Sequence, residues 1–187
     1  SPDARMVGFV YENNIYLKKL DYDTEVTVTT DGKIGEIING VPDWVYQEEF
    51  GILNSLAFSS DNTTLSYLKW NERDVPTYTF PIYEGVCNRH KEYSKYPGEF
   101  SYKYPVAGEA NSIVTVNNYD VETRKTKQIK LPDNVYYIAN IKYAPSPDRL
   151  MVMTLNRDQN SLQLFAVNPK STVSKLVYTD NSDSWIN

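Results

Sequence analysis

The sequence predicts an all-β fold, a partial β-propeller with about three blades of antiparallel strands, from three observations. Tyrosine is in excess, with 16 Tyr against 6 Phe and 3 Trp, and tyrosine favours strands because its ring packs while its hydroxyl stays hydrated. Short apolar strands alternate with polar turns along most of the chain. A Ser-x-Asp turn followed by an apolar strand occurs three times, with its aspartates at Asp3, Asp61 and Asp148.

Each of these turns introduces a strand, a second polar turn and a partner strand. After Asp3 the apolar segment is followed by Glu-Asn-Asn at 12–14, which is typical of a hairpin turn. The third strand of this unit is closed by Asp31-Gly32. The strands predicted from these patterns span residues 6–10, 15–20, 25–30, 64–70, 150–155 and 161–167.

Residues 71–105 interrupt the repeat and match no blade strand. Two Tyr-rich extended segments, 75–80 and 100–105, flank a charged tip, which predicts a protruding β-arm. An ordinary long loop is the alternative, but loops without structure of their own rarely exceed about 15 residues.

Three blades do not close a ring, since propellers use about four to eight. We therefore expect the 187 residues to be a fragment of one larger propeller domain. The predicted division is a blade at 1–38, a helical segment at 39–51, a second blade at 52–70 and 106–135 with the arm at 71–105 between its halves, and a further blade at 136–187.

Composition excludes several classes of function. Lys+Arg 19 against Asp+Glu 24 gives a net charge of -5, so no charge-based affinity for nucleic acid or anionic lipid is expected. No apolar run approaches the roughly 18 residues that span a bilayer. Cys87 is the single cysteine and His90 the single histidine, so a catalytic triad would have to use His90, which lies in a polar stretch. No metal site or cofactor is indicated.

The segment 39–51 breaks the strand rhythm and carries the candidate chemistry. Asp43 after a proline is a good N-cap and Gly51 a good C′ residue, so a helix of about two turns is expected between them. On a helix, Glu48 and Glu49 lie about 100° apart and can reach one ligand. Two adjacent carboxylates without a basic neighbour in sequence suit an ammonium group. The alternatives are a solvated acidic helix surface and, less well supported, a metal site without a third ligand.

Residues 43–49 read Asp-Trp-Val-Tyr-Gln-Glu-Glu after Asn-Gly-Val-Pro. This segment resembles the double-Glu motif of the dipeptidyl peptidase IV group in the prolyl oligopeptidase family, whose usual form is Asp-Trp-Val-Tyr-Glu-Glu-Glu. Residues 1–18 resemble the preceding blade of that family, and residues 102–111 resemble the segment that follows its extension arm. Gln47 departs from the usual first Glu, and the two substrate-binding carboxylates correspond to Glu48 and Glu49.

The resemblance implies the N-terminal part of a serine dipeptidyl peptidase. Family members join an eight-bladed propeller to a C-terminal α/β-hydrolase domain and remove N-terminal dipeptides with Pro or Ala in second position. It implies Glu48 and Glu49 as the binding site for the substrate's α-ammonium group, supported by the motif residues Asp43, Trp44 and Tyr46. The catalytic triad belongs to the other domain, so this chain alone is expected to be inactive.

The resemblance also implies the partners: the N-terminus of a peptide substrate, the hydrolase domain of the same polypeptide, and a second copy bound through the arm at 71–105. It implies a periplasmic or cell-envelope location, and the lack of disulfides favours a bacterial source. From the residues alone, a non-catalytic periplasmic or surface propeller that binds a ligand or a protein is the alternative.

Overall fold

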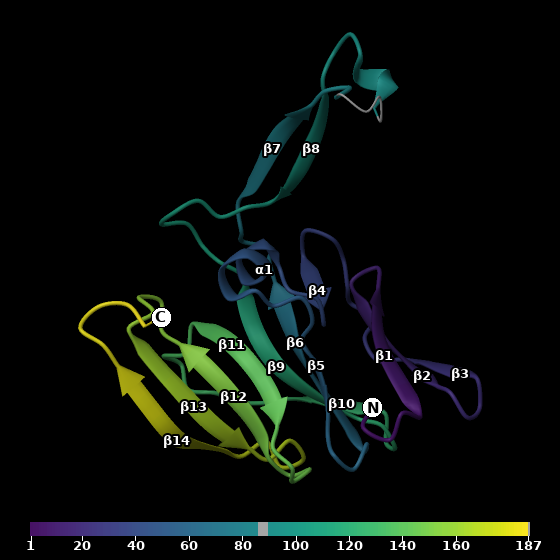
Figure 1. The fold of residues 1–187 in the computed structure, drawn as a ribbon, viewed down its shortest axis with the longest axis vertical. Coiled ribbons are helices and arrows are strands. Elements are labelled where there is room, and N and C mark those ends of the chain that lie inside the picture. The colour runs from purple at the N-terminus through teal and green to yellow at the C-terminus, as the bar shows by residue number, and fades with distance from the viewer. Residues whose placement is uncertain (86–89, 187) are drawn as a thin grey trace.

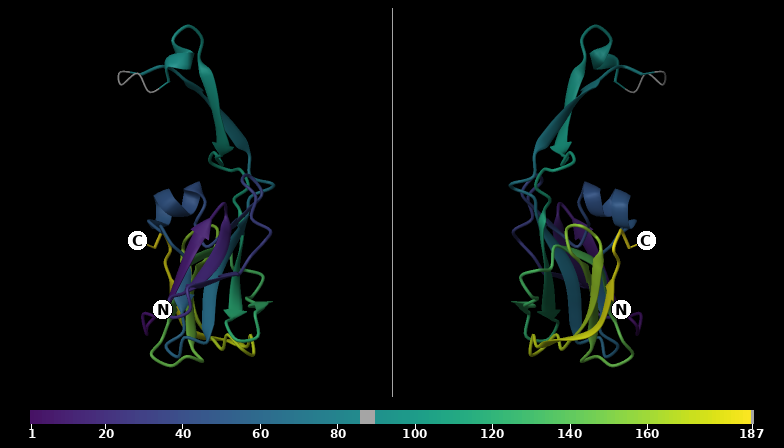
Figure 2. Two further views of the ribbon diagram at one scale, coloured as in Figure 1. Left: turned by 90° about the vertical axis from the view of Figure 1, so that its right-hand side faces the viewer. Right: turned by 90° about the vertical axis from the view of Figure 1, so that its left-hand side faces the viewer.

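The computed structural model describes residues 1–85 and 90–186, and Cys87 lies outside the described residues. The described residues form three antiparallel sheets that stand side by side, a short α-helix and a two-stranded ribbon that projects from one end (Figures 1 and 2). The predicted all-β class, with one short helix and one protruding arm, is confirmed.

The first sheet has three strands in the order β1-β2-β3. They are β1 (Met6–Tyr11), β2 (Asn14–Lys19) and β3 (Thr24–Thr27). Tyr11 pairs with Asn14, and the two residues between them, Glu12 and Asn13, have positive φ angles of 47° and 61°. Two successive positive φ angles are typical of a type I′ hairpin turn, whose twist matches that of the flanking strands.

The second sheet contains the point at which the helix is inserted. Its strands are β4 (Ile37–Asn39), β5 (Leu56–Phe58), β6 (Thr64–Asn71), β9 (Ile113–Asp120) and β10 (Lys125–Gln128). Both β4 and β5 pair with the same edge of β6, while β9 pairs with the other edge. The predicted division at residue 38 grouped Ile37 and Ile38 with the first blade, whereas backbone pairing joins them to the second sheet, where Ile38 lies opposite Trp70.

The third sheet has four strands in chain order. They are β11 (Tyr137–Tyr143), β12 (Leu150–Leu155), β13 (Ser161–Val167) and β14 (Ser174–Asn181). β12 and β13 have the bounds predicted from the sequence, because in both cases a polar turn stops the apolar pattern sharply.

The repeated Ser-x-Asp turn has the same geometry at the start of β1, β6 and β12. Ser1 Oγ donates to Asp3 Oδ1 and Ser59 Oγ donates to Asp61 Oδ1, both at 2.6 Å. Ser146 Oγ donates to Asp148 Oδ1 in the same way. The three strands are therefore equivalent positions in three blades, as the repeat predicted.

The projecting ribbon is the predicted arm. It consists of β7 (Thr77–Ile82) and β8 (Gly98–Lys103), with a 3₁₀ turn, η1 (Lys91–Tyr93), near its tip. The first strand begins at Thr77 rather than at Val75, because the Val75 N–H closes a turn on the Glu72 carbonyl. Cross-strand aromatic pairs stiffen the ribbon; the rings of Phe80 and Tyr102 stack with centroids 5.6 Å apart.

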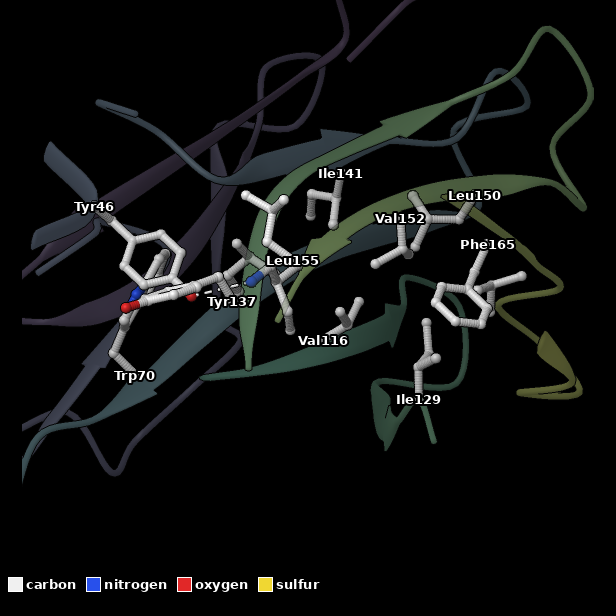
Figure 3. Close-up of a cluster of buried hydrophobic side chains, with 13 residues drawn as sticks. Tyr46, Trp70, Val116, Ile129, Tyr137, Ile141, Leu150, Val152, Leu155 and Phe165 are labelled. Carbon is white, nitrogen blue, oxygen red and sulfur yellow. Dashed lines mark hydrogen bonds between the residues drawn. The ribbon is translucent and has the colours of Figure 1, made fainter. Parts of the chain in front are cut away.

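β6 is buried on both faces and forms the centre of the packing. Leu65 and Tyr67 belong to a cluster shared with the first sheet, which also contains Ile15. Leu68 and Trp70 face the other way, into a larger cluster shared with the third sheet (Figure 3). Since hydrophobic burial is the main favourable term in folding, β6 holds the three sheets together.

A polar network joins the second and third sheets beside the larger cluster. The Tyr143 hydroxyl lies 2.8 Å from Thr64 Oγ1 and 2.9 Å from Ser66 Oγ. Both Tyr143 and Ser66 donate to the side-chain oxygen of Asn118, whose amide donates to the Pro169 carbonyl. Buried polar groups need such partners, so this network favours one way of packing the two blades against each other.

Removing the hydroxyl at the centre of this network is expected to destabilise the fold. Tyr143→Phe leaves hydroxyls of the second sheet short of a partner, which lowers the free energy of unfolding by about 1–3 kcal/mol. Equilibrium urea unfolding measures the change. Tyr178→Phe is the matched control, because Tyr178 is 55% exposed on β14 and should change stability by less than about 0.5 kcal/mol. Equal effects of the two substitutions would contradict the role of the network.

Candidate functional site

The helix that carries the two glutamates is α1 (Trp44–Phe50), and its caps are the predicted ones. Asp43 Oδ1 accepts the backbone N–H of Tyr46 at 3.0 Å, which satisfies a donor at the open helix end. Gly51 ends the helix with φ +63°, and its N–H donates to the Tyr46 carbonyl. This left-handed conformation favours glycine because it has no Cβ.

Tyr46 fixes the helix to the core of the protein. Its side chain is 1% exposed, and its hydroxyl accepts the backbone N–H of Ile138 at 3.0 Å. Its ring meets Trp70 edge-on at 5.4 Å between centroids and lies 5.1 Å from Phe50. Figure 3 shows Tyr46 and Trp70 at one end of the buried cluster, beside Tyr137. One helical side chain therefore contacts both the second and the third sheet.

The amino-terminal end of α1 contacts the base of the arm. Asp43 is buried, and its second carboxylate oxygen accepts the Ser112 hydroxyl at 2.5 Å. The ring of Trp44 lies 4.4 Å from that of Tyr104, the residue that follows β8. Of the residues predicted to support the motif, Asp43 and Trp44 contact the segment between β8 and β9, and Tyr46 contacts the second and third sheets.

Glu48 and Glu49 lie on the exposed side of α1. They are adjacent on a helix and so diverge by about 100° while remaining close. Among the described residues, no lysine, arginine or histidine forms an ion pair with either carboxylate. In the structure the two predicted site residues are therefore adjacent exposed carboxylates on a helix whose opposite side is packed on the core through Tyr46.

Gln47 departs from the usual motif and has a local role. Its side-chain amide donates to the Pro42 carbonyl at 2.7 Å, across the start of the helix. An ionised glutamate has no proton to donate to a carbonyl, so glutamine is the residue that can make this hydrogen bond. The substitution leaves Glu48 and Glu49 as the exposed acidic pair.

A cleft of about 640 Å³ lies beside this contact, between α1, the segment that precedes it and the arm. Trp44 and Gln47 line its helix side and Phe100 and Tyr102 its arm side. Glu72, at the point where the chain leaves β6 for the arm, also lines the cleft and is only 5% exposed. No sequence signal distinguishes Glu72 from the solvated glutamates of the chain, because its neighbours, Gly35, Asp43 and Lys103, are distant in sequence.

The two buried carboxyl groups near the cleft have perturbed acidities. Burial raises the pKa of Asp43, and the hydrogen bonds from Ser112 and from the Tyr46 N–H oppose that rise. Burial is the main cause of a raised pKa of Glu72, and the nearby Asp43 charge adds to it. A hydrogen bond from the Gly35 N–H and the positive charge of Lys103 act in the opposite direction and lower this pKa. Lys103 Nζ itself donates to the backbone carbonyls of Arg73 and Val75, at 3.1 and 2.8 Å.

Comparison with known proteins identifies the family. A family model described as the dipeptidyl peptidase IV N-terminal region matches residues 1–187. The chain belongs to this family. Its sequence is 46% identical to that of Porphyromonas gingivalis dipeptidyl peptidase 4, whose crystal structure superposes on it with a TM-score of 0.91. The match covers 99% of this chain and 25% of that one. It is also 34% identical to a probable dipeptidyl-aminopeptidase B of Aspergillus niger, over 97% of this chain.

The dipeptidyl peptidase IV fold is shared more widely than the sequence. A putative dipeptidyl aminopeptidase IV of Bacteroides ovatus is 22% identical, with a TM-score of 0.77, and that likeness concerns the fold alone. The chain spans 21% of the length of the Aspergillus niger relative. These matches confirm the predicted partial β-propeller of the N-terminal region. Within the described residues, the structure contains no helix of the length and apolar character that crossing a membrane requires.

The raised pKa of Glu72 predicts a pH-dependent loss of stability. Between its ordinary value of 4.5 and its raised folded-state pKa, the folded protein keeps a proton that the unfolded chain releases, so stability falls as pH rises through that window. Glu72→Gln removes this term, and its stability should therefore increase relative to wild type from pH 4 to pH 8. Urea midpoints across this range measure the difference.

Glu99→Gln is the control for this measurement, since Glu99 is an exposed glutamate on β8. Its urea midpoint should follow that of the wild type across the range. A Glu72→Gln midpoint that differs from wild type by a constant amount at every pH would contradict the assignment.

Proposed function

We propose that this chain is the substrate-anchoring part of the propeller in a serine dipeptidyl peptidase. In this proposal Glu48 and Glu49 bind the α-ammonium group at the N-terminus of a peptide. The observation that carries the proposal is a pair of adjacent exposed carboxylates on a helix held by a buried tyrosine. Relatives named dipeptidyl peptidase and dipeptidyl-aminopeptidase support it.

The chemistry of an ammonium group matches this arrangement. It offers three N–H donors and one positive charge, and two carboxylates can accept two or three of these donors through charge-assisted hydrogen bonds. An ion pair in open solvent is worth little, typically about 0–1 kcal/mol. The anchor therefore becomes strong when a second domain covers it, because exclusion of water lowers the local dielectric.

Anchoring one end of the substrate also sets where the chain is cut. If the ammonium group is held at a fixed distance from a nucleophile, only the second peptide carbonyl reaches it, and its orientation contributes to the rate. This predicts removal of N-terminal dipeptides. From the family resemblance, we also propose that the released dipeptides are Xaa-Pro or Xaa-Ala, with Pro or Ala as the second residue.

The catalytic serine, aspartate and histidine are proposed to come from an α/β-hydrolase domain of the same polypeptide. The chain covers 25% of the Porphyromonas gingivalis enzyme, which leaves ample length for such a domain there. His90 is the single histidine of this chain, and it stacks on Tyr93 near the tip of the arm, with centroids 5.7 Å apart. This chain alone should therefore be inactive. A periplasmic or cell-envelope location in a bacterium completes the proposal.

The arm is proposed to join two copies of the enzyme. Tyr83, Phe100 and Tyr78 are 64%, 54% and 49% exposed on a ribbon that projects into solvent (Figure 1). Aromatic residues are enriched in protein interfaces, where they bury large rigid surfaces. An exposed aromatic ribbon of this kind is suited to a homodimer contact.

Removing either carboxylate tests the anchor. In the full-length protein, Glu48→Ala and Glu49→Ala should each lower kcat/KM for release of an N-terminal dipeptide by on the order of 10²-fold or more, because a charge-assisted partner of the ammonium group is lost. Cleavage of a chromogenic Ala-Pro amide measures the effect. Glu122→Ala, an exposed glutamate in the turn after β9, is the control and should keep wild-type activity.

Near-normal activity of both variants would refute the anchor. If the full-length wild type releases no dipeptide at all, the peptidase proposal fails, and the alternative is a non-catalytic propeller that binds a ligand or a protein.

Removing one exposed ring tests the arm. In the full-length protein, Phe100→Ser should shift the population from dimer to monomer, since interface aromatic residues contribute about 2 kcal/mol or more when central. Analytical ultracentrifugation at micromolar concentration measures the shift. Leu176→Ser on β14, where Leu176 is 45% exposed, is the control and should leave the distribution unchanged. Identical sedimentation of Phe100→Ser and wild type would exclude the arm as the main contact.

A further inference from the structure

Two contacts join α1 to the base of the arm, and the proposed anchoring of substrate does not use them. Ser112 donates its hydroxyl to Asp43 at 2.5 Å, and both residues are buried, 6% and 7% exposed. Trp44 packs on Tyr104 at 4.4 Å between centroids. The Tyr104 N–H donates to the Pro76 carbonyl at 2.9 Å, which closes the base of the ribbon. Both contacts therefore attach the start of the helix to the arm.

Tyr104 and Ser112 lie at the two ends of one segment of chain. Tyr104 follows the last residue of β8 and Ser112 precedes the first residue of β9, so residues 104–112 form the return segment from the arm to the sheet. Asn111 of this segment donates to the Tyr137 hydroxyl at 2.9 Å. The segment is thus held by the arm at one end and by the third sheet at the other, and the helix rests on it.

The helix depends on such contacts for its orientation. A helix of seven residues is too short to be stable by itself in water, so tertiary contacts determine where it points. Glu48 lies one turn beyond Trp44 on the same side of the helix, because residues four apart are neighbours. A rotation at the start of the helix consequently displaces Glu48 and Glu49.

We propose that Ser112 and Tyr104 are positioning residues for the substrate's ammonium group, acting through Asp43 and Trp44 on the direction of Glu48 and Glu49. This inference rests on the anchoring function proposed above. Loss of the Ser112 hydroxyl leaves one buried oxygen of Asp43 without its partner, and a buried acceptor in that state gains by moving toward water. That movement turns the start of the helix and misaligns the carboxylates.

Steady-state kinetics of the full-length enzyme tests the proposal with Ser112→Ala, Ser112→Thr and Ser101→Ala. Ser112→Ala should raise KM for an Ala-Pro amide about tenfold, the size of one lost buried hydrogen bond. The inhibition constant of the free dipeptide Ala-Pro should rise by the same factor. Ser112→Thr keeps the hydroxyl and should restore most of the affinity. Ser101 bonds only across the arm, to Thr79 at 2.7 Å among the described contacts, so Ser101→Ala should leave both constants unchanged.

A serine-directed phosphonofluoridate without an ammonium group separates positioning from general damage. Its inactivation rate reports the catalytic serine alone and should be the same in Ser112→Ala and wild type. A KM equal to that of Ser101→Ala, or an inactivation rate that falls together with affinity, would overturn the proposal. If Ser112→Ala does not fold, Tyr104→Leu keeps the hydrogen bond to Asp43 and is judged by the same criteria.

The Glu48→Ala and Glu49→Ala variants distinguish this inference from the function on which it rests. If they leave affinity for the Ala-Pro dipeptide unchanged, the anchoring function fails and the positioning role fails with it. If they weaken binding while Ser112→Ala and Tyr104→Leu do not, the anchor stands and only the positioning role is wrong.

Discussion

The burial of Tyr46 is the interaction on which the arrangement of the site depends. A helix of seven residues cannot hold two carboxylates in position by its own stability. Tyr46 supplies the missing constraint, because its ring enters the larger hydrophobic cluster and its hydroxyl accepts the Ile138 N–H on the third sheet. Both ends of the side chain are thus satisfied, the apolar ring by packing and the polar tip by a hydrogen bond. The charged face of the helix is left facing outward.

The second sheet brings the helix and the arm together. The helix is inserted between β4 and β5, which pair with the same edge of β6, and the arm is inserted between β6 and β9. β4 pairs with residues 69–71, the end of β6 from which the arm departs. The chain leaves β4 at Asn39, opposite Lys69, and returns in β5 at Leu56, opposite Tyr67, so the helix is inserted along this edge of β6, close to the arm end of the strand. Figure 2 shows α1 below the ribbon. Their contact through Asp43 and Trp44 follows from that topology.

Local sequence signals predicted the start or end of an element well where that position requires a particular residue type. Asp43 and Gly51 marked the helix because capping and left-handed φ depend on residue type. The turn aspartates marked the strand starts for a similar reason. The signals failed at Ile37 and Ile38, whose strand pairs with the second sheet rather than the first. The residue pattern of a strand indicates which of its side chains can be buried, but it does not determine which strand it pairs with.

What the sequence by itself determined is the class of fold, the repeat, the short helix and the identity of the acidic pair, all of which depend on neighbouring residues. What only the tertiary structure decided is which residues surround that pair. Ser112 lies 69 residues from Asp43, and Glu72 is buried beside Gly35, Asp43 and Lys103, none of which is its neighbour in sequence. Hydrogen bonding and burial at such positions depend on contacts between distant segments. Those contacts exist only in the folded protein, where neighbouring sheets cover both faces of β6.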